Sequence, residues 1–418
     1  MLTKKLLKKE IYVISVPSAT LIYAPLTRNF ILYKGRVTLD DVETDWLKEA
    51  TNIENVPPFI REKGFSVDSE KLRLRMNITT NCNLQCEYCS VNAAGGEGKN
   101  MSDIIAQRAV TEFCKVAKNR GVKELEISFS GGEPTLRIAF IEQLVRIAQQ
   151  ELVDSQIKLS LRLITNGLFS RQKFISIAEL MKEVQVSWDG PADKSPRYSN
   201  KIDLANEVWS NIKFLVSRKI PVSILTVVSS GNYLYLQEII DGLYKVGMRK
   251  IFLALEDDVG RAFGRPAAIN YSKLGDIYFN LWKIYKDRGV EINLGGTDIH
   301  AISVYPCGVP IPNYSVAPDG SISACTITFN DRSRFAKTFL IGSVDESNLR
   351  IDEDAIRRLR RLNVLNMKEC RRCFVKWHCR GGCMYAKPNN RLRSLPAERC
   401  KMIKDIAARK LLATILER

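Results

Sequence analysis

Three cysteines, Cys82, Cys86 and Cys89, lie close together in the sequence and are the residues best suited to chemistry. They follow a segment, residues 72–78, in which apolar and polar side chains alternate. Three thiolates on a short loop can hold three irons of a [4Fe–4S] cluster and leave the fourth iron without a protein ligand. An iron with a vacant position can bind and reduce a small molecule, whereas a fully ligated cluster mainly transfers electrons. The alternative is a zinc site, but structural zinc takes four ligands and this loop offers three.

The composition is typical of a soluble protein that buries a large core. Of the 418 residues, 45% are hydrophobic, which suits one large domain with one or two smaller ones. No apolar run reaches the roughly 18 residues of a membrane span, and the basic N-terminus lacks the apolar segment of a secretion signal. Eleven cysteines without an export signal indicate metal ligation in a reducing cytoplasm rather than disulfides. We therefore expect a cytoplasmic protein without membrane contact.

The formal net charge of +17 indicates attraction to acidic partners. A basic surface raises the local concentration of such partners, and salt screens the effect. Nucleic acid and an acidic peptide are both candidates. A generally basic, solvated surface is the alternative that requires no partner.

The first part of the chain, residues 1–66, is expected to form a small strand-and-helix unit. The predicted strands are residues 11–16, 20–23 and 30–33, which prolines separate. A helix is predicted to follow, with Thr38 as its N-cap and Asp40 and Asp41 in its first turn. Pro57 and Pro58 end this unit, which either caps the larger domain or docks a peptide.

Residues 67–295 alternate between strand and helix patterns. The predicted strands are residues 72–79, 124–130, 158–164, 183–188, 221–228 and 250–255. The predicted helices are residues 102–119, 136–151, 171–182, 202–218, 234–246 and 272–288. Six such units imply parallel strands joined by right-handed crossovers, in an open sheet or a curved partial barrel. We expect an α/β fold with a partial (β/α)6 TIM-like barrel, which places chemistry at the C-terminal ends of the strands.

Glycine and polar residues follow three of the predicted strands. They are Gly131, Gly132, Glu133 and Pro134 after the second strand, Thr165 and Asn166 after the third, and Ser187 and Asp189 after the fourth. Adjacent glycines allow backbone groups to approach a ligand closely, and the Glu133 carboxylate could accept hydrogen bonds from an ammonium group. Ordinary turns are the alternative for each of these segments.

The C-x3-C-x2-C spacing, with Tyr88 before the last cysteine, resembles the signature of the radical S-adenosylmethionine (SAM) superfamily. Residues 131–134 resemble the segment of that family that holds the methionyl amino group of SAM. Residues 187–191 resemble a Ser-x-Asp-Gly-Pro stretch whose polar side chains reach the SAM ribose. A His-Asp pair and an arginine usually follow there; here residues 195–196 replace the pair and only Arg197 matches. The resemblance implies SAM bound to a [4Fe–4S] cluster.

Seven C-terminal cysteines resemble the full cysteine pattern of the SPASM domain, an auxiliary-cluster module, which we expect in residues 296–418. By this resemblance one auxiliary [4Fe–4S] cluster is held by Cys370, Cys373, Cys379 and Cys400, and a second by Cys307, Cys325 and Cys383. Two four-iron clusters need eight thiolates for full ligation, and seven are present. A zinc ribbon is the alternative.

In fully ligated relatives an eighth cysteine occupies the place of Ala301. The second auxiliary cluster is therefore expected to have either a vacant iron or a substitute ligand. His300, one of only two histidines, is the candidate substitute, against a simple polar loop residue. The remaining thiol, Cys114, lies in a helical pattern and is predicted to pack as a small apolar residue. A helix is predicted from residue 400 to residue 418.

The resemblance implies an enzyme that generates a 5′-deoxyadenosyl radical and removes hydrogen from a peptide. The favoured outcome is a crosslink (thioether, C–C or C–O) in an acidic, ribosomally made precursor peptide. A flavodoxin or ferredoxin is the expected reductant, and a separate peptide-recognition protein is a further candidate partner. The first alternative is sulfatase-maturase-like oxidation of a Ser or Cys on a protein. The second is a metal-dependent nucleic-acid-binding protein without activity, which leaves the SAM-binding motifs without a purpose.

Overall fold

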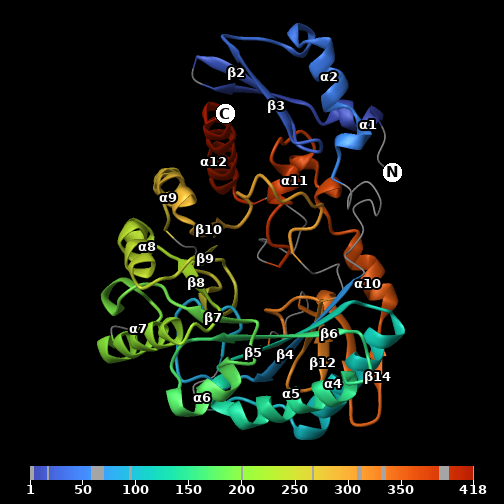
Figure 1. The fold of residues 1–418 in the computed structure, drawn as a ribbon, viewed down its shortest axis with the longest axis vertical. Coiled ribbons are helices and arrows are strands. Elements are labelled where there is room, and N and C mark those ends of the chain that lie inside the picture. The colour runs from blue at the N-terminus through green and yellow to red at the C-terminus, as the bar shows by residue number, and fades with distance from the viewer. Residues whose placement is uncertain are drawn as a thin grey trace.

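The structure is a computed structural model that describes residues 4–16, 18–57, 70–93, 97–198, 201–265, 268–307, 313–330, 336–385 and 395–417. Figure 1 shows the N-terminal unit at one end of the long axis and the helices α5 and α6 at the other. Within the part of the chain so described, no helix has both the length and the apolar character needed to cross a bilayer.

The centre of the fold is a run of parallel strands, as predicted. These strands are β4 (Lys71–Thr79), β5 (Glu124–Gly131), β6 (Lys158–Thr165), β7 (Glu183–Ser187), β8 (Val222–Val228) and β9 (Lys250–Leu255). Each strand pairs in parallel with the next along the chain. The predicted α/β class with a parallel-strand partial barrel is therefore confirmed.

Helices cover the outer face of this sheet between successive strands (Figure 1). They are α4 (Asp103–Asn119), α5 (Ile138–Leu152), α6 (Arg171–Ala178), α7 (Ile202–Ser217), α8 (Leu236–Lys245) and α9 (Tyr271–Tyr285). The prediction extended α6 to residue 182, which is wrong by four residues. The chain turns after Ala178, and the Lys182 amide then bonds to the Leu161 carbonyl at 2.8 Å, which starts strand β7.

Alternate side chains of the strands point to opposite faces of the sheet. On β4 the apolar residues Leu72, Leu74 and Met76 are completely buried in the main hydrophobic core. The residues between them, Arg73 and Arg75, point to the other, inner face. The inner face of the barrel is therefore polar near β4.

The sheet is longer than the sequence predicted, with 11 strands in the order β10-β9-β8-β7-β6-β5-β4-β11-β12-β13-β14. The additional strands are β10 (Glu291–Leu294), β11 (Asn313–Val316), β12 (Ser321–Ser323), β13 (Leu340–Val344) and β14 (Leu349–Ile351). Strand β11 pairs in parallel with β4, so the C-terminal region extends the sheet of the barrel directly. Strands β12, β13 and β14 follow in antiparallel pairing.

The N-terminal unit contains three antiparallel strands close to the predicted ones. Its elements are α1 (Lys4–Lys9), β1 (Tyr12–Val16), β2 (Ala19–Ala24), β3 (Asn29–Lys34), a 3-10 turn (Leu39–Asp41), α2 (Thr44–Ala50) and a second 3-10 turn (Ile53–Asn55). Thr38 is the N-cap as predicted, with Asp40 and Asp41 in the first turn, but the element is a 3-10 turn and not an α-helix. The Thr38 amide donates to the Asp41 carboxylate at 2.6 Å, and Val42 is extended. The α-helix begins only at Thr44. Pro58, predicted to end the unit, lies outside the described residues.

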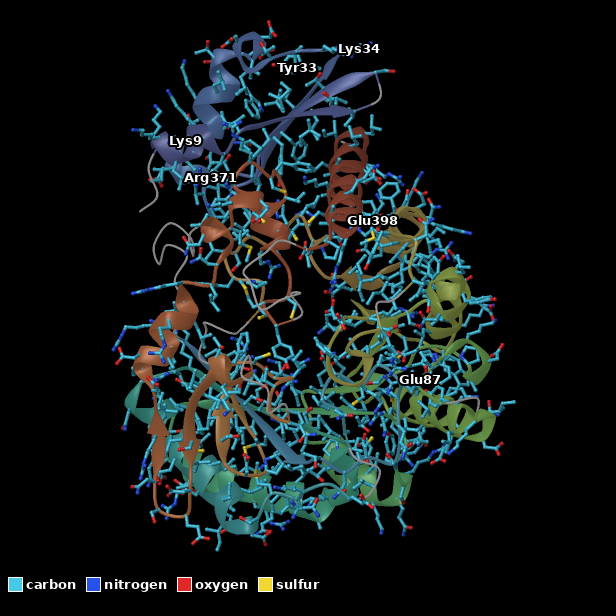
Figure 2. All side chains as sticks on the ribbon, turned by 180° about the vertical axis from the view of Figure 1, so that it is seen from behind. Lys9, Tyr33, Lys34, Glu87, Arg371 and Glu398 are labelled. Carbon is cyan, nitrogen blue, oxygen red and sulfur yellow. The ribbon has the colours of Figure 1, made fainter. Side chains whose placement is uncertain are left out.

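The N-terminal unit packs on the C-terminal, cysteine-rich region (Figure 1). The buried Glu10 carboxylate pairs with Lys376 at 2.6 Å and accepts a bond from the Trp377 indole at 2.7 Å. Tyr23 bonds to the ring of His378 at 2.8 Å. Buried charges of this kind are tolerated because they are paired. In Figure 2, Arg371 accordingly lies next to this unit.

The C-terminal region ends in helices that connect it to the barrel. These helices are α10 (Glu353–Arg360), α11 (Lys376–Cys379) and α12 (Ala397–Leu416). Helix α12 lies against α9, where Arg409 pairs with Asp276 at 2.6 Å and Lys410 donates to the Tyr278 hydroxyl at 3.0 Å. The predicted terminal helix is confirmed and starts three residues earlier, at Ala397, than residue 400.

Candidate active site

The loop after β4 brings Cys82, Cys86 and Cys89 together, each half-buried. The Leu84 amide donates to the Cys82 sulfur and the Ala93 amide donates to the Cys89 sulfur, both at 3.4 Å. Burial raises the pKa of the Cys82 thiol to about 12, so this sulfur becomes a thiolate only when a cation compensates it. N–H donors directed at sulfur are also typical of the thiolates that hold iron–sulfur clusters. The loop therefore fits a [4Fe–4S] cluster.

A clamp from the segment after β9 fixes this loop, and the sequence did not reveal it. The Arg261 guanidinium donates to the Cys86 carbonyl and to the Ala93 carbonyl, both at 2.6 Å. Its amide donates to the Cys89 carbonyl at 2.9 Å. Gly260 lies so close to the loop that a Cβ atom there would be 2.3 Å from the Cys89 carbonyl oxygen. No spacing signal links these residues to the cysteines, because 175 positions separate Arg261 from Cys86.

Substitution Gly260→Ala is expected to displace the cysteine loop. The new methyl group would meet backbone atoms of Cys89 and Ser90 at less than 3 Å, so the loop must move. We expect iron content and 5′-deoxyadenosine formation to fall at least about tenfold, because ligand groups must be held to within a fraction of an ångström.

Gly264→Ala is the matched control for this prediction. Gly264 also has a positive φ, +79° against +58° for Gly260, but a Cβ atom there meets nothing within 4 Å. It should cost only the strain of that backbone conformation, about 1–2 kcal/mol, and leave the iron content unchanged. Equal iron contents in the two variants, measured after anaerobic reconstitution, would contradict the clamp.

The predicted glycine pair after β5 serves a close approach between two loops of the protein. The Gly132 amide donates to the Thr79 carbonyl and the Glu133 amide to the Asn81 carbonyl, both at 2.8 Å. A Cβ atom at Gly131 or Gly132 would lie 2.2 or 2.1 Å from those carbonyl oxygens. The glycines therefore fix the segment after β5 to the start of the cysteine loop, a partner that the sequence had not indicated.

The Glu133 carboxylate is bonded by donors of the protein itself, and its predicted contact with an ammonium group stays a prediction. Its residue is completely buried, and its oxygens accept bonds from the Thr135 amide at 3.0 Å, the Thr165 hydroxyl at 2.8 Å and the Asn166 amide at 2.6 Å. Burial raises the pKa of Glu133, and these donors oppose the rise. In this structure Glu133 positions the turn after β6, with Pro134 buried beside it.

Asn166 connects that turn to the cysteine loop. Its side-chain amide donates to the side-chain oxygen Oδ1 of Asn83 at 2.7 Å and lies 3.6 Å from the Cys82 sulfur. The segments after β4, β5 and β6 thus form one hydrogen-bonded layer at the C-terminal edge of the sheet. The sequence predicted that these residues lie at the C-terminal edge of the sheet, and the structure shows the hydrogen bonds between them.

Asp189, which follows β7, is the centre of a second buried group. Its carboxylate pairs with Arg197 at 3.0 Å, accepts a bond from the Val227 amide at 2.8 Å and is bonded by the Tyr88 hydroxyl. Burial lowers the pKa of Arg197, but the Asp189 carboxylate together with Cys86 and Tyr198 raises the pKa above its usual value. Tyr88 therefore ties the cysteine loop to this pair. Ser187 is half-buried at the end of β7.

The C-terminal cysteines form two neighbourhoods. Burial raises the pKa of Cys325, and the thiols of Cys383 and Cys307 raise it further. Burial likewise raises the pKa of Cys379 to about 12, and three neighbouring thiols raise it further: Cys400, Cys373 and Cys370. These are the same two sets that the resemblance implies as ligand sets; their ligation of clusters is a proposal. Among the described residues, no three Cys, His, Asp or Glu side chains converge closely enough for a single metal ion.

The two histidines differ in their surroundings near the loop before Cys307, and ligation of a cluster by His300 stays a prediction. His300 is exposed; its amide bonds to Asp298 and its carbonyl accepts a bond from Arg28 at 3.1 Å. Its ring forms no hydrogen bond with any described residue. His378 is buried instead and bonds to the Ala301 carbonyl at 2.9 Å. The backbone at the position of the missing cysteine is thus held by His378.

Comparisons with known proteins agree with this geometry. A family model described as the Radical SAM superfamily matches residues 76–241. The serine-type anaerobic sulfatase-maturating enzyme of Klebsiella aerogenes is 24% identical over 340 residues, which cover 74% of this chain and 80% of that protein. An uncharacterised protein of Methanocaldococcus jannaschii is 29% identical over 188 residues, and the matched part spans only 62% of its length.

Two solved structures share the fold. Native anSMEcpe with bound AdoMet has a TM-score of 0.66 and 18% identity, covering 82% of this chain and 99% of that chain. SuiB of Streptococcus suis bound to S-adenosylmethionine has a TM-score of 0.57 and 13% identity, covering 93% of this chain and 98% of that chain. SuiB has also been solved with its precursor peptide SuiA, and anSMEcpe with a peptide called Cp18Cys.

Proposed function

The chain is a radical SAM enzyme of the SPASM-type maturase group, and we propose that it forms a crosslink in a ribosomally made peptide. The observation that carries the proposal is the hydrogen-bonded layer at the C-terminal edge of the sheet, which joins Cys82 to Asn166 and Tyr88 to Asp189. It provides three thiols beside a buried polar wall, as a radical reaction requires.

A [4Fe–4S] cluster bound by Cys82, Cys86 and Cys89 would supply one electron to the sulfonium of SAM and so generate the 5′-deoxyadenosyl radical. The chain's own residues hold the geometry for that step. Amides donate to the sulfurs, Arg261 clamps the loop, and the Asp189–Arg197 pair fixes the segment after β7. Burial of this layer limits access of water and other hydrogen donors, which would quench a radical.

We propose that the SAM-facing residues are those predicted after the strands, with a smaller direct role for Glu133 and Asp189. Both carboxylates are already bonded by protein donors. Backbone groups of Gly131–Pro134, the side chains of Thr165, Asn166 and Ser187, and the Tyr88–Arg197 wall remain the proposed contacts. His300 remains a proposed ligand of the second auxiliary cluster only if its exposed ring turns toward the cysteines.

An acidic peptide is the proposed substrate of the crosslinking reaction. The net charge of +17 favours encounter with an acidic partner. The similarity to SuiB covers 93% of this chain, against 82% for anSMEcpe. We propose that residues 1–66 dock the peptide, residues 67–295 form the catalytic barrel and residues 296–418 hold two auxiliary clusters. A flavodoxin or ferredoxin reductant, a separate recognition protein and a cytoplasmic location complete the proposal.

Sulfatase-maturase-like oxidation of a Ser or Cys is a second candidate function. It is favoured by the 24% identity to the Klebsiella aerogenes enzyme over 340 residues. The two functions share the radical-generating step and differ in the fate of the substrate radical. Crosslinking joins two residues of one peptide, whereas oxidation changes one residue alone.

The test uses anaerobically reconstituted full-length protein with dithionite and SAM. We expect 5′-deoxyadenosine to form, and to form faster with a short acidic precursor peptide than with a Cys-x-Pro-x-Arg peptide. Tandem mass spectrometry should show loss of hydrogen with a bond between two residues. Oxidation of the Cys in the second peptide would replace the crosslinking proposal, and absence of 5′-deoxyadenosine would refute both functions.

A further inference from the structure

The inner face of β4 carries two arginines in different surroundings. The strand register places Arg73 opposite Glu126 of β5, so its neighbour carries a carboxylate. Arg75 lies opposite Ser128 of β5 and Ser315 of β11, so both of its neighbours are small and uncharged. Side chains directly opposite each other in a sheet interact most strongly. Arg75 therefore lacks the charge partner that Arg73 has.

The two serines leave space around Arg75. A cavity of about 160 Å³ opens here, lined by Arg73, Leu74, Arg75, Glu126, Ser128, Arg162, Asn313, Tyr314, Ser315 and Thr326. This volume is several times that of one water molecule, about 30 Å³. Among the described residues, the lining carries three arginines and a single carboxylate, so this part of the cavity is cationic.

The single carboxylate of the cavity is already in use. Glu126 pairs with Lys71 at 2.6 Å and with Arg73 and Arg162 at 4.0 Å each. Arg162 also reaches Glu183, a carboxylate outside the cavity. Arg75 forms no ion pair and no hydrogen bond with any residue in the described part of the chain.

Arg75 is therefore a half-buried cation without a direct ion-pair partner among the described residues, and only the more distant Glu126 carboxylate and Cys325 offset its burial. Burial lowers its pKa to about 10, and the nearby charge of Arg162 contributes, so the guanidinium stays protonated at neutral pH. A cation that is shielded from water without a direct partner destabilises the protein, unless a ligand provides the counter-charge. An arginine also presents its donors in a planar fork that matches a carboxylate.

The cavity also lies next to the C-terminal cysteines. Cys325 lies close enough to Arg75 for its thiolate form to raise the pKa of the arginine, and Thr326, the residue after Cys325, lines the cavity. An anion held by Arg75 would thus lie on the inner face of the barrel, beside the Cys307, Cys325 and Cys383 neighbourhood. That position lies several residues before the end of β4, away from the cysteine loop that follows the strand.

We propose that this cavity binds an acidic side chain, Asp or Glu, of the peptide substrate, and that Arg75 is its anchoring residue. This inference rests on the proposed function, because it assumes a peptide inside the barrel. It adds a specificity rule: the substrate carries a carboxylate at a fixed distance from the residue that is modified.

The test measures binding of a small probe to the reconstituted holoenzyme with SAM. N-acetyl-glutamate-N-methylamide supplies the carboxylate, and N-acetyl-glutamine-N-methylamide is its neutral counterpart. By calorimetric titration, the glutamate probe should bind the wild type more tightly than the glutamine probe. Substitution Arg75→Gln should weaken it about tenfold to a hundredfold, because a charge-assisted bidentate bond is lost.

A second variant and a control show whether a loss of probe binding comes from the cavity or from misfolding. Substitution Ser128→Asp places a carboxylate opposite Arg75, so it should displace the probe while giving the arginine a partner in the fold. Substitution Arg108→Gln removes an arginine on the surface helix α4 that pairs with Glu112, and should leave probe binding unchanged. Equal probe binding by the wild type, Arg75→Gln and Ser128→Asp would overturn the proposal.

Two further readouts separate this inference from the proposed function. If the wild type forms no 5′-deoxyadenosine, the proposed function fails and the inference fails with it. If 5′-deoxyadenosine forms normally while Arg75→Gln retains probe binding, the cavity assignment alone is overturned. An Arg75→Gln variant that keeps probe binding but changes the electron paramagnetic resonance of the reduced clusters would also overturn it, since Arg75 would then pair with a cluster at Cys325.

Discussion

Substitution Cys86→Ala is expected to reduce 5′-deoxyadenosine formation to the background of the assay. Cys86 lies between the two other thiols of the loop, and its carbonyl is held by Arg261 at 2.6 Å. Two thiolates cannot retain a four-iron cluster whose fourth iron already lacks a protein ligand. Iron and sulfide content should fall by one cluster, with the C-terminal cysteines unaffected. Chemical iron determination and chromatography of the SAM products measure both effects.

Substitution Cys114→Ala is the control, because it also removes one cysteine. Cys114 is completely buried in helix α4, and burial raises the pKa of its thiol to about 12. Loss of its sulfur leaves a small cavity, which lowers the free energy of unfolding by about 1 kcal/mol. The iron content should stay unchanged. Retention of full SAM cleavage by Cys86→Ala, or loss of a cluster in Cys114→Ala, would refute the assignment of the three loop cysteines.

The barrel strands were predictable because their signal is local. Residues 71–79 alternate between polar and apolar side chains over a whole strand, and the apolar set is completely buried, as that alternation implies. Strands β10–β14 were missed because they are three to five residues long. Strand β11 exists through its pairing with β4, and a contact such as Asn77 to Val316 spans 239 residues. Pairing between such distant segments produces no periodic pattern of apolar residues in either segment.

Site residues could be predicted where they lie close together in the sequence. They could not be predicted where their partners are far away in the sequence. The three loop cysteines and the residues after β5, β6 and β7 do meet at one edge of the sheet. The protein partners of the Glu133 and Asp189 carboxylates could not be predicted. The sequence does not distinguish a carboxylate that is bonded within the protein from one that faces a ligand. Thr38 illustrates the local limit: a cap residue followed by acidic residues suits a 3-10 turn as well as an α-helix.

Substitution Asp189→Asn is expected to be the most destabilising single change near the site. It leaves Arg197, which is only 6% exposed, as a buried cation without its carboxylate at 3.0 Å. Removing one partner of a buried ion pair costs about 3–5 kcal/mol of folding free energy. The asparagine still accepts from the Val227 amide, so the loss comes mainly from the charge. Anaerobic urea unfolding of the holoenzyme measures it, with exposed Asp193→Asn on the next turn as the control, expected within about 0.5 kcal/mol.

The double variant Asp189→Asn with Arg197→Gln separates stability from activity. Removing the second charge takes away the uncompensated cation, so part of the lost stability should return, which gives a non-additive double-mutant cycle. SAM cleavage should stay low, because Tyr88 of the cysteine loop then has only neutral side chains in place of the ion pair to which it was bonded. If the double variant recovered both stability and SAM cleavage, the pair would serve folding alone. If Asp189→Asn unfolded at the wild-type urea concentration, the pair would not be the buried anchor of the loop.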